Sequence, residues 1–147
     1  MTIDPWEFID SHTSMMIASS DKKAHPHCSY APFVRDEQKF YICLSGMAKH
    51  NKNIRYHDAL SIMFIEDEAS CDNLMARKRV TFDVVAKPIG RETEIFTNTI
   101  ERFRDKIGEH TDIYESLPDF QLFELAIVSG RAVYGFGQAY DFKEGSF

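Results

Sequence analysis

The sequence predicts a mainly β (α+β) protein, a small closed or split antiparallel β-barrel of about seven strands with two or three helices. Three observations support this fold class. The 147 residues include twelve Phe and six Tyr, and aromatic residues favour strands. Short runs with the two-residue period of a strand recur between turn signals. Only two segments show a clear helical period. The length favours a single domain, residues 1–147.

The first part of the chain combines a short helix with three strands. We expect the helix over residues 3–10, because Asp4 can cap it and Pro5 suits its first position. Pro32 lacks a backbone N–H, so the strand that contains it should be an edge strand or carry a bulge. The three strands are expected over residues 11–19, 27–34 and 40–44.

The period changes after the third strand. Residues 47–56 have apolar positions at helical spacing, and Ser45 is placed to cap this helix. The nearly continuous apolar run at residues 60–65 predicts a buried strand.

A basic cluster opens the next predicted strand, residues 76–88. The two-residue period that follows would place Arg77 and Arg79 on one side and Lys78 on the other. One interpretation is a solvated strand start that pairs with the acidic run at residues 66–68. The other is an anion site, because Arg suits bidentate contacts with a phosphate or a propionate.

The last part of the chain contains the clearest helix, residues 91–107, with Gly108 as its C-cap. Its apolar residues recur as a stripe along one face. After a loop with some helical turn, residues 120–128 predict a strand, and the Ser129-Gly130 pair predicts a turn. A last strand is expected over residues 131–140, with Gly135 and Gly137 permitting a bend.

Charge and composition exclude several function classes. The net charge is −6, which disfavours nucleic-acid binding, because that affinity depends on neutralised phosphates. No segment is apolar over the length that a membrane helix needs, and the start of the chain lacks a signal-peptide pattern. The three Cys give no disulfide framework. We therefore expect a cytoplasmic protein, and a homodimer that covers the open side of the small barrel.

Six blocks of sequence, in order, resemble the HugZ/HutZ haem-utilisation family, a branch of the pyridoxamine-phosphate-oxidase-like, FMN-binding split β-barrels. The resemblance runs from about residue 12 to residue 142. The blocks are residues 29–34, 45–54, 61–67, 76–83, 119–120 and 135–140.

The resemblance implies a homodimeric split barrel that binds haem near the dimer interface and degrades it with oxygen and an external reductant. His50 would lie near the haem, and Arg79 would face a propionate or bound oxygen; both are the candidate catalytic residues. Asp119 would support an axial histidine. The family's axial histidine lies in a C-terminal extension, and no histidine follows His110 here, so the sequence leaves the metal ligand open.

Two alternatives remain beside haem binding. In a flavin-binding oxidoreductase, Ser45, Lys49, Arg77 and Arg79 would hold the FMN phosphate. In a non-enzymatic binding domain, the fold would remain without the chemistry.

Overall fold

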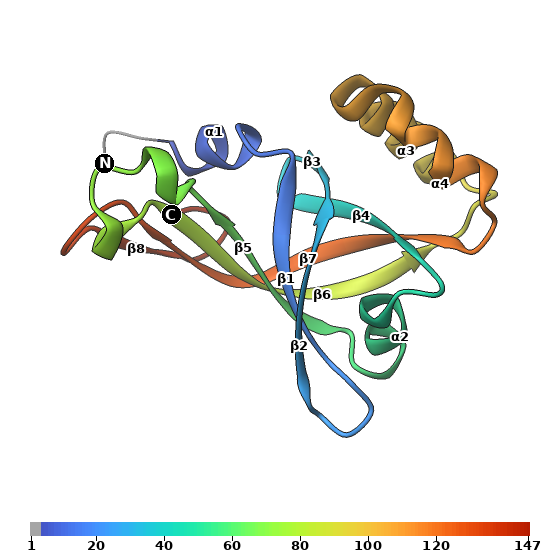
Figure 1. Cartoon of the computed structure of the whole chain (residues 1–147), viewed down its shortest axis with the longest axis horizontal. Helices are drawn as coiled ribbons and strands as arrows, with labels where there is room; N and C mark the ends of the chain where they lie inside the picture. The colour runs from blue at the N-terminus through green and yellow to red at the C-terminus, as the bar shows by residue number, and fades with distance from the viewer. Residues whose placement is uncertain (1–3) are drawn as a thin grey trace.

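The computed structural model describes residues 4–147, and one antiparallel sheet dominates them (Figure 1). The strand order is β2-β1-β5-β6-β7-β4-β3, with β8 beside β7. The strands are β1 (Ser14–Ser20), β2 (Pro26–Pro32), β3 (Val34–Asp36), β4 (Lys39–Ser45), β5 (Ala59–Ile65), β6 (Arg79–Ile89), β7 (Phe120–Val133) and β8 (Ala139–Phe142). The α-helices are α1 (Pro5–Asp10), α2 (Lys49–Tyr56), α3 (Glu94–Ile107) and α4 (Asp112–Ser116), with short 3-10 turns η1 (Glu68–Ser70), η2 (Leu74–Ala76) and η3 (Gly108–Thr111).

The chain itself closes the sheet into a barrel. The strands at the two ends of the order, β2 and β3, are separated only by Phe33. Phe33 is fully buried, and its N–H donates to the carbonyl of Thr13 at 3.2 Å. The single strand predicted over residues 27–34 is therefore divided here. Pro32 ends an edge strand, as expected, and the mainly β split-barrel class is confirmed.

Aromatic side chains fill the barrel. Phe64 lies 4.9 Å from Phe33 and 5.4 Å from Phe40, measured between ring centroids, and Phe40 lies 5.5 Å from Phe82. Tilted and edge-on pairs of this kind add to the stabilisation from apolar burial. The predicted alternation of β6 is confirmed, because its inward residues are all buried: Val80, Phe82, Val84 and Ala86.

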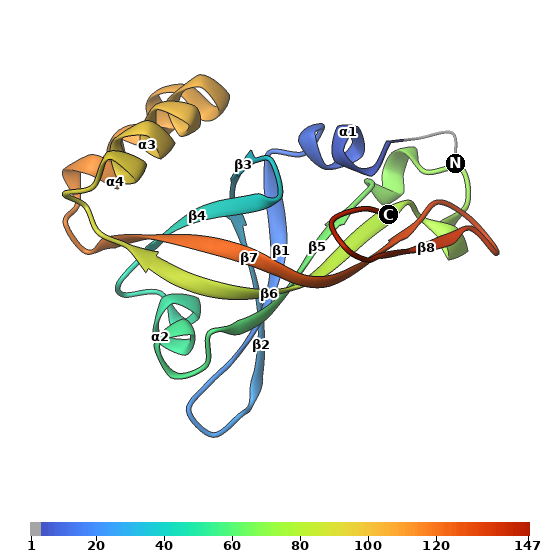
Figure 2. The same ribbon diagram turned by 180° about the vertical axis from the view of Figure 1, so that it is seen from behind.

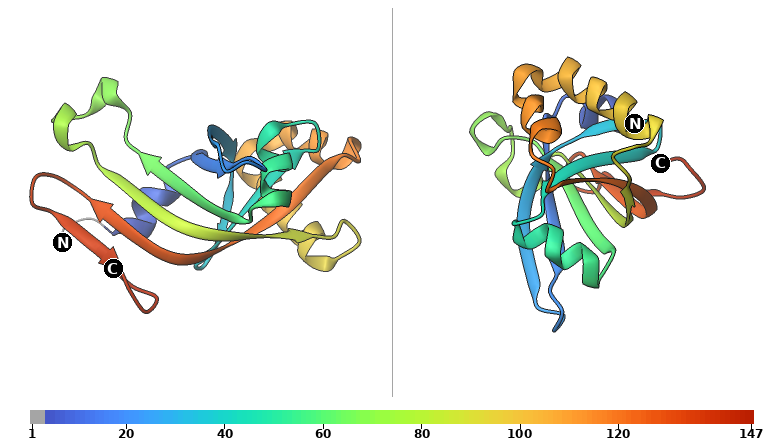
Figure 3. Two further views of the ribbon diagram at one scale, coloured as in Figure 1. Left: turned by 90° about the horizontal axis from the view of Figure 1, so that it is seen from below. Right: turned by 90° about the vertical axis from the view of Figure 1, so that its right-hand side faces the viewer.

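A second, smaller core lies between α3 and the sheet. Phe96, Ile100 and Phe103 pack with residues of β4, β7 and α4, and α3 and α2 lie on opposite sides of the sheet (Figure 3). The predicted helix is confirmed as Glu94–Ile107, followed by Gly108 at a φ of 64°. Of the helix predicted over residues 3–10, Ile3 lies outside the described residues.

The predicted turn at Ser129-Gly130 is wrong. β7 continues through both residues and runs beside β6 over most of its length (Figure 2). Ser129 pairs with Asp83 and Ile127 with Val84, so one extra residue forms a β-bulge. Glycine is required at position 130 by close packing, because a Cβ there would collide with the Phe82 ring.

The last predicted strand is also wrong in its bounds. The chain leaves β7 at Val133, turns through Tyr134–Gln138, and re-enters the sheet as β8. Gly137 has a φ of 70°, which belongs to the turn and not to a strand. Within residues 4–147 no helix has the length and apolar character needed to cross a membrane.

Candidate functional site

Ser45 and Asp119 meet where β4 ends and β7 begins. Ser45 Oγ donates to Asp119 Oδ2 at 3.0 Å, and the Gly46 N–H donates to the Asp119 carbonyl at 2.8 Å. Ser45 Oγ also accepts from the Met47 N–H. The predicted cap of α2 is wrong, because the helix begins at Lys49, Ala48 is its N-cap, and that cap makes no side-chain bond. Ser45 instead joins the β4–α2 connection to the start of β7.

His50 lies half-buried on the first turn of α2, against strand β2. Its Nδ1 lies 2.9 Å from Ser29 Oγ. Burial lowers the pKa of His50, and the nearby His27 lowers it further, so the neutral imidazole is favoured. Lys49, the preceding residue, is exposed.

Two buried asparagines fix the position of α2. Asn51 donates to the Leu44 carbonyl at 2.9 Å, and Asn53 donates to Ser19 Oγ at 3.0 Å. Because buried amides that lose their partners are costly, these bonds hold His50 against the sheet.

The basic cluster lies elsewhere, at the start of β6. Arg77 donates from Nε and Nη2 to the Glu66 carbonyl, at 3.1 and 2.5 Å. The Lys78 N–H donates to the Glu66 carboxylate at 2.6 Å, and Arg79 Nη1 donates to the Arg77 carbonyl at 2.9 Å. The acidic run therefore does meet the cluster, through Glu66. Arg77 itself lies before the strand, since β6 begins at Arg79, so the two-residue period does not apply to the pair.

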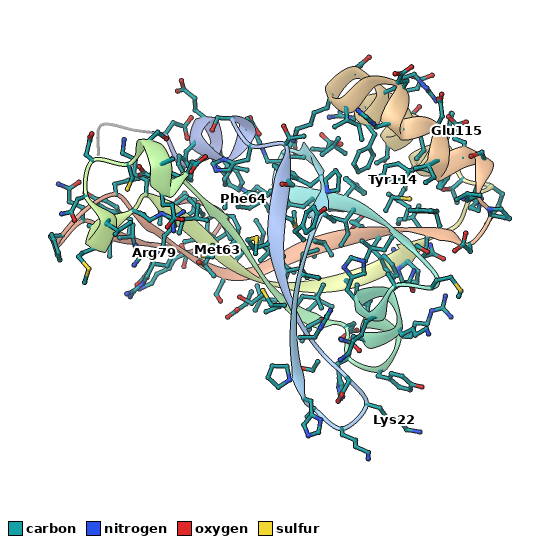
Figure 4. The ribbon with its side chains drawn as sticks, viewed as in Figure 1. Lys22, Met63, Phe64, Arg79, Tyr114 and Glu115 are labelled. Atoms are coloured by element: carbon teal, nitrogen blue, oxygen red, sulfur yellow. The ribbon has the colours of Figure 1, made fainter. Side chains whose placement is uncertain are left out.

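The length of β6 separates these two groups. Arg79, labelled in Figure 4, pairs with Val133, whereas Ile89 at the other end of β6 pairs with Leu122, close to Asp119. At about 3.3 Å per residue, ten residues of strand span roughly 30 Å. The structure brings Ser45 and Asp119 together, with Lys49 and His50 on the adjoining helix. It does not bring Arg77 and Arg79 to them within one chain.

Sequence reasoning missed two residues of these groups, Ser29 and His27, which lie beside His50. The two-residue period of β2 could have indicated them, because it places His27 and Ser29 on the inward side with the buried Ala31. Nothing local identifies α2 as the element that packs there. In the part of the chain that the structure describes, no three His, Cys, Asp or Glu side chains gather as metal ligands would.

The outward face of the sheet carries a continuous row of side chains across six strands. The pairing register places them side by side in the order Tyr30, Met16, Met63, Thr81, Arg131 and Asp141. Tyr30, Met16 and the neighbouring Val85 are exposed apolar residues on this face. Thr81 and Arg131 help to line a groove of about 1030 Å³. The part of this face that α3 does not cover is large, partly apolar and open in the single chain.

Comparison with known proteins identifies the family. The model for pyridoxamine 5'-phosphate oxidase matches residues 6–134. The chain belongs to this family. Within it, heme oxygenase HutZ of Vibrio cholerae serotype O1 is 39% identical over 134 residues, which cover 91% of this chain and 76% of that relative. The resemblance to the HugZ/HutZ branch is thereby confirmed.

Solved structures of the family agree with the fold. The crystal structure of HutZ from Vibrio cholerae, described as a heme storage protein, has a TM-score of 0.86 and 34% identity and covers 92% of this chain and 99% of its own. The crystal structure of Campylobacter jejuni ChuZ has a TM-score of 0.88 and 35% identity, over 95% of this chain and 58% of its own.

Proposed function

We propose that this protein binds haem as a member of the haem-utilisation branch of its family. The observation that carries the proposal is the 39% identity to heme oxygenase HutZ over 91% of this chain. The structure adds groups of the right chemistry: the half-buried imidazole of His50 on α2, the Asp119 carboxylate held by Ser45, the arginines before and at the start of β6, and an apolar surface.

The residues fit a haem in their donor chemistry. The ligand is largely apolar and carries two propionates. Only Nη1 of Arg79 donates a hydrogen bond within residues 4–147, so its other N–H groups can meet a carboxylate. His50 uses Nδ1 toward Ser29. When that nitrogen carries the proton, Nε2 presents a lone pair toward a ligand.

A homodimer would bring the two groups together, because they lie at opposite ends of β6. A two-fold axis that lies in the contact plane, beside the outward face and perpendicular to β6 at the level of its middle, would set the two β6 strands antiparallel. The Arg79 end of one protomer then lies beside the partner's α2, which carries His50. The outward row from Tyr30 to Asp141 would form the contact, and burial of Met16, Met63 and Val85 would stabilise it.

We further propose oxygen-dependent haem degradation that releases iron. The haem supplies oxygen activation when it is bound. Arg79 would hold a propionate and place positive charge beside the haem, and His50 would line the pocket as a neutral hydrogen-bonding group. Asp119, held by Ser45, is placed to orient a donor next to α2.

A flavin-binding oxidoreductase is the second candidate, and the match to the pyridoxamine 5'-phosphate oxidase model favours it. The geometry at Ser45 opposes it, because the Ser45 hydroxyl donates to Asp119 and a carboxylate there repels a phosphate.

Absorption spectroscopy tests both candidates. Haem binding predicts a strong haem band when the purified protein is titrated with haemin. Arg79→Ala should weaken the affinity by about 10- to 100-fold, which is the contribution of a charge-assisted hydrogen bond, whereas Arg102→Ala on α3 should not. A well-folded protein without any haem band contradicts the proposal, and a yellow protein as purified supports the flavin instead.

A further inference from the structure

Positive charge gathers at one end of an otherwise acidic molecule. We call this end the basic lobe and define it as residues 21–28, at the turn between β1 and β2, and residues 47–58 around α2. It holds four of the six histidines and five Lys and Arg against two Asp, a net charge of +3, whereas the rest of the chain carries −9. The cations are Lys22, Lys23, Lys49, Lys52 and Arg55.

Contacts join the two segments of the basic lobe. Lys22 Nζ lies 5.7 Å from the Tyr56 ring centroid, and the bonds from α2 to Ser29 and Ser19 fix the helix against both strands of the hairpin. Figure 4 shows Lys22 at the far tip of this hairpin, away from α3 and α1. Lys23, Lys52 and Arg55 are exposed. The lobe is therefore a protruding and well-anchored surface.

The acidic residues of the lobe do not cancel its charge. Asp21 accepts the backbone N–H groups of Lys23 and His25 at 2.8 and 2.9 Å, so its carboxylate is used inside the turn. Those bonds, first of all that from His25, lower the pKa of Asp21. Asp58 ends the α2 segment, and Asp119 lies beyond the helix start, bound to Ser45. A partner that approaches the hairpin tip meets cations first.

We propose that the basic lobe is the docking surface for an acidic electron-donor protein. This rests on the proposed function, which needs an external reductant: the partner is oxidised and dioxygen is reduced at the haem. Docking on the hairpin tip and on the side of α2 that carries Lys52 and Arg55 would place the donor one helix away from His50 and leave the His50 side of α2 to the haem and the partner protomer. Opposite charge on two proteins steers their encounter and fixes their orientation. The negative charge over the rest of the chain repels a long polyanion, which disfavours nucleic acid as the partner.

The test measures docking without haem, so that it stands apart from the proposed function. The ¹⁵N-labelled, haem-free protein is titrated with flavodoxin and, separately, with an acidic ferredoxin, and the amide shifts are followed by NMR. We expect saturable shifts in residues 21–28 and 49–58. We expect the Kd to rise about tenfold when NaCl is raised from about 50 to about 200 mM.

Charge reversal gives the matched comparison. Lys23→Glu/Lys52→Glu should weaken the Kd about tenfold, whereas Lys87→Glu/Lys143→Glu, with the same change in net charge, should leave it within about twofold. Equal effects of the two double variants, or no binding of either probe, overturn the proposal. A change of oligomeric state in Lys23→Glu/Lys52→Glu also overturns the proposal, because the lobe is then a subunit interface. So does a short oligonucleotide that shifts the same amide signals and binds more tightly than either probe. A haemin titration of each variant reports on haem binding independently.

Discussion

Ser45 Oγ donates a hydrogen bond of 3.0 Å to Asp119 Oδ2, across a separation of 74 residues. The same two segments are joined by the bond from the Gly46 N–H to the Asp119 carbonyl. The pair thus connects β4, α2 and β7 at the place where the candidate imidazole lies.

Asp119→Ala tests the strength of this connection. The side-chain bond is exposed and the backbone bond remains, so we expect a loss of about 0.5–1.5 kcal/mol in the free energy of unfolding. Urea unfolding measures it, and Asp72→Ala, at an exposed position, is the control. A loss as large as that of a core truncation would show that Asp119 does more than hold Ser45.

Gly130→Ala tests the close contact of β7 with Phe82. The new Cβ has no space beside the ring, so we expect a destabilisation of about 1–3 kcal/mol. Phe82→Leu should recover part of this loss in the double variant, because it removes the atoms in the way. Simple additivity of the two changes would show that the ring is not the cause.

His50→Gln tests the lowered pKa of the half-buried imidazole. In the unfolded chain His50 takes up a proton near its ordinary pKa of 6.5, whereas the folded protein resists protonation until a lower pH. Stability is therefore lost as the pH falls through 6.5. We expect His50→Gln to flatten this part of the curve of unfolding free energy against pH, and an unchanged curve contradicts this.

Lys106 makes the free energy of unfolding depend on pH in the alkaline range. Burial lowers its pKa to about 8, with Nζ 3.5 Å from the Phe33 ring centroid and donating to the Phe33 carbonyl. Between pH 8 and the unfolded value of 10.5 the unfolded chain holds the extra proton, so stability from this group rises with pH. NMR titration of the lysine Cε signals should find one group near 8 that disappears in Lys106→Met. A Lys106 signal that titrates with the other lysines contradicts this.

Met63→Glu tests the proposed homodimer. The wild type should sediment at twice the chain mass of 17.0 kDa, and a charge in the outward row should give the monomer, because an unpaired charge opposes burial. Ile95→Glu, on the exposed face of α3, should remain a dimer. A monomeric wild type would remove the argument for a shared site.

Local patterns predicted much of this fold. The alternation of β6 and the apolar stripe of α3 follow from short-range periods, and both were confirmed. The Ser129-Gly130 pair shows the limit: its local preference is a turn, but packing against Phe82 and pairing with β6 keep it inside a strand. The closure of the barrel at Phe33 depends on which strands pair. No local pattern in the sequence predicts that pairing.

The candidate site was harder to predict than the fold. The resemblance selected Ser45, His50 and Asp119 one by one, while the bond between Ser45 and Asp119 is a long-range contact. The sequence predicted that Arg77 and Arg79 lie together on one side of a strand, because an alternating apolar run follows these cations. The η2 turn and the Glu66 carbonyl fix the position of Arg77. The spacing of apolar residues along the sequence predicts neither of them.

The pairing of β4 with β7 has a consequence during synthesis. β4 leaves the ribosome first, and its partner strand follows only after the 74 residues that separate Ser45 from Asp119. At about 5–20 residues per second, that delay is roughly 4–15 s. Throughout it, the edge of β4 that pairs with β7 in the folded protein has no partner strand. The nascent chain is therefore most exposed to aggregation and to chaperones before residues 120–133 emerge.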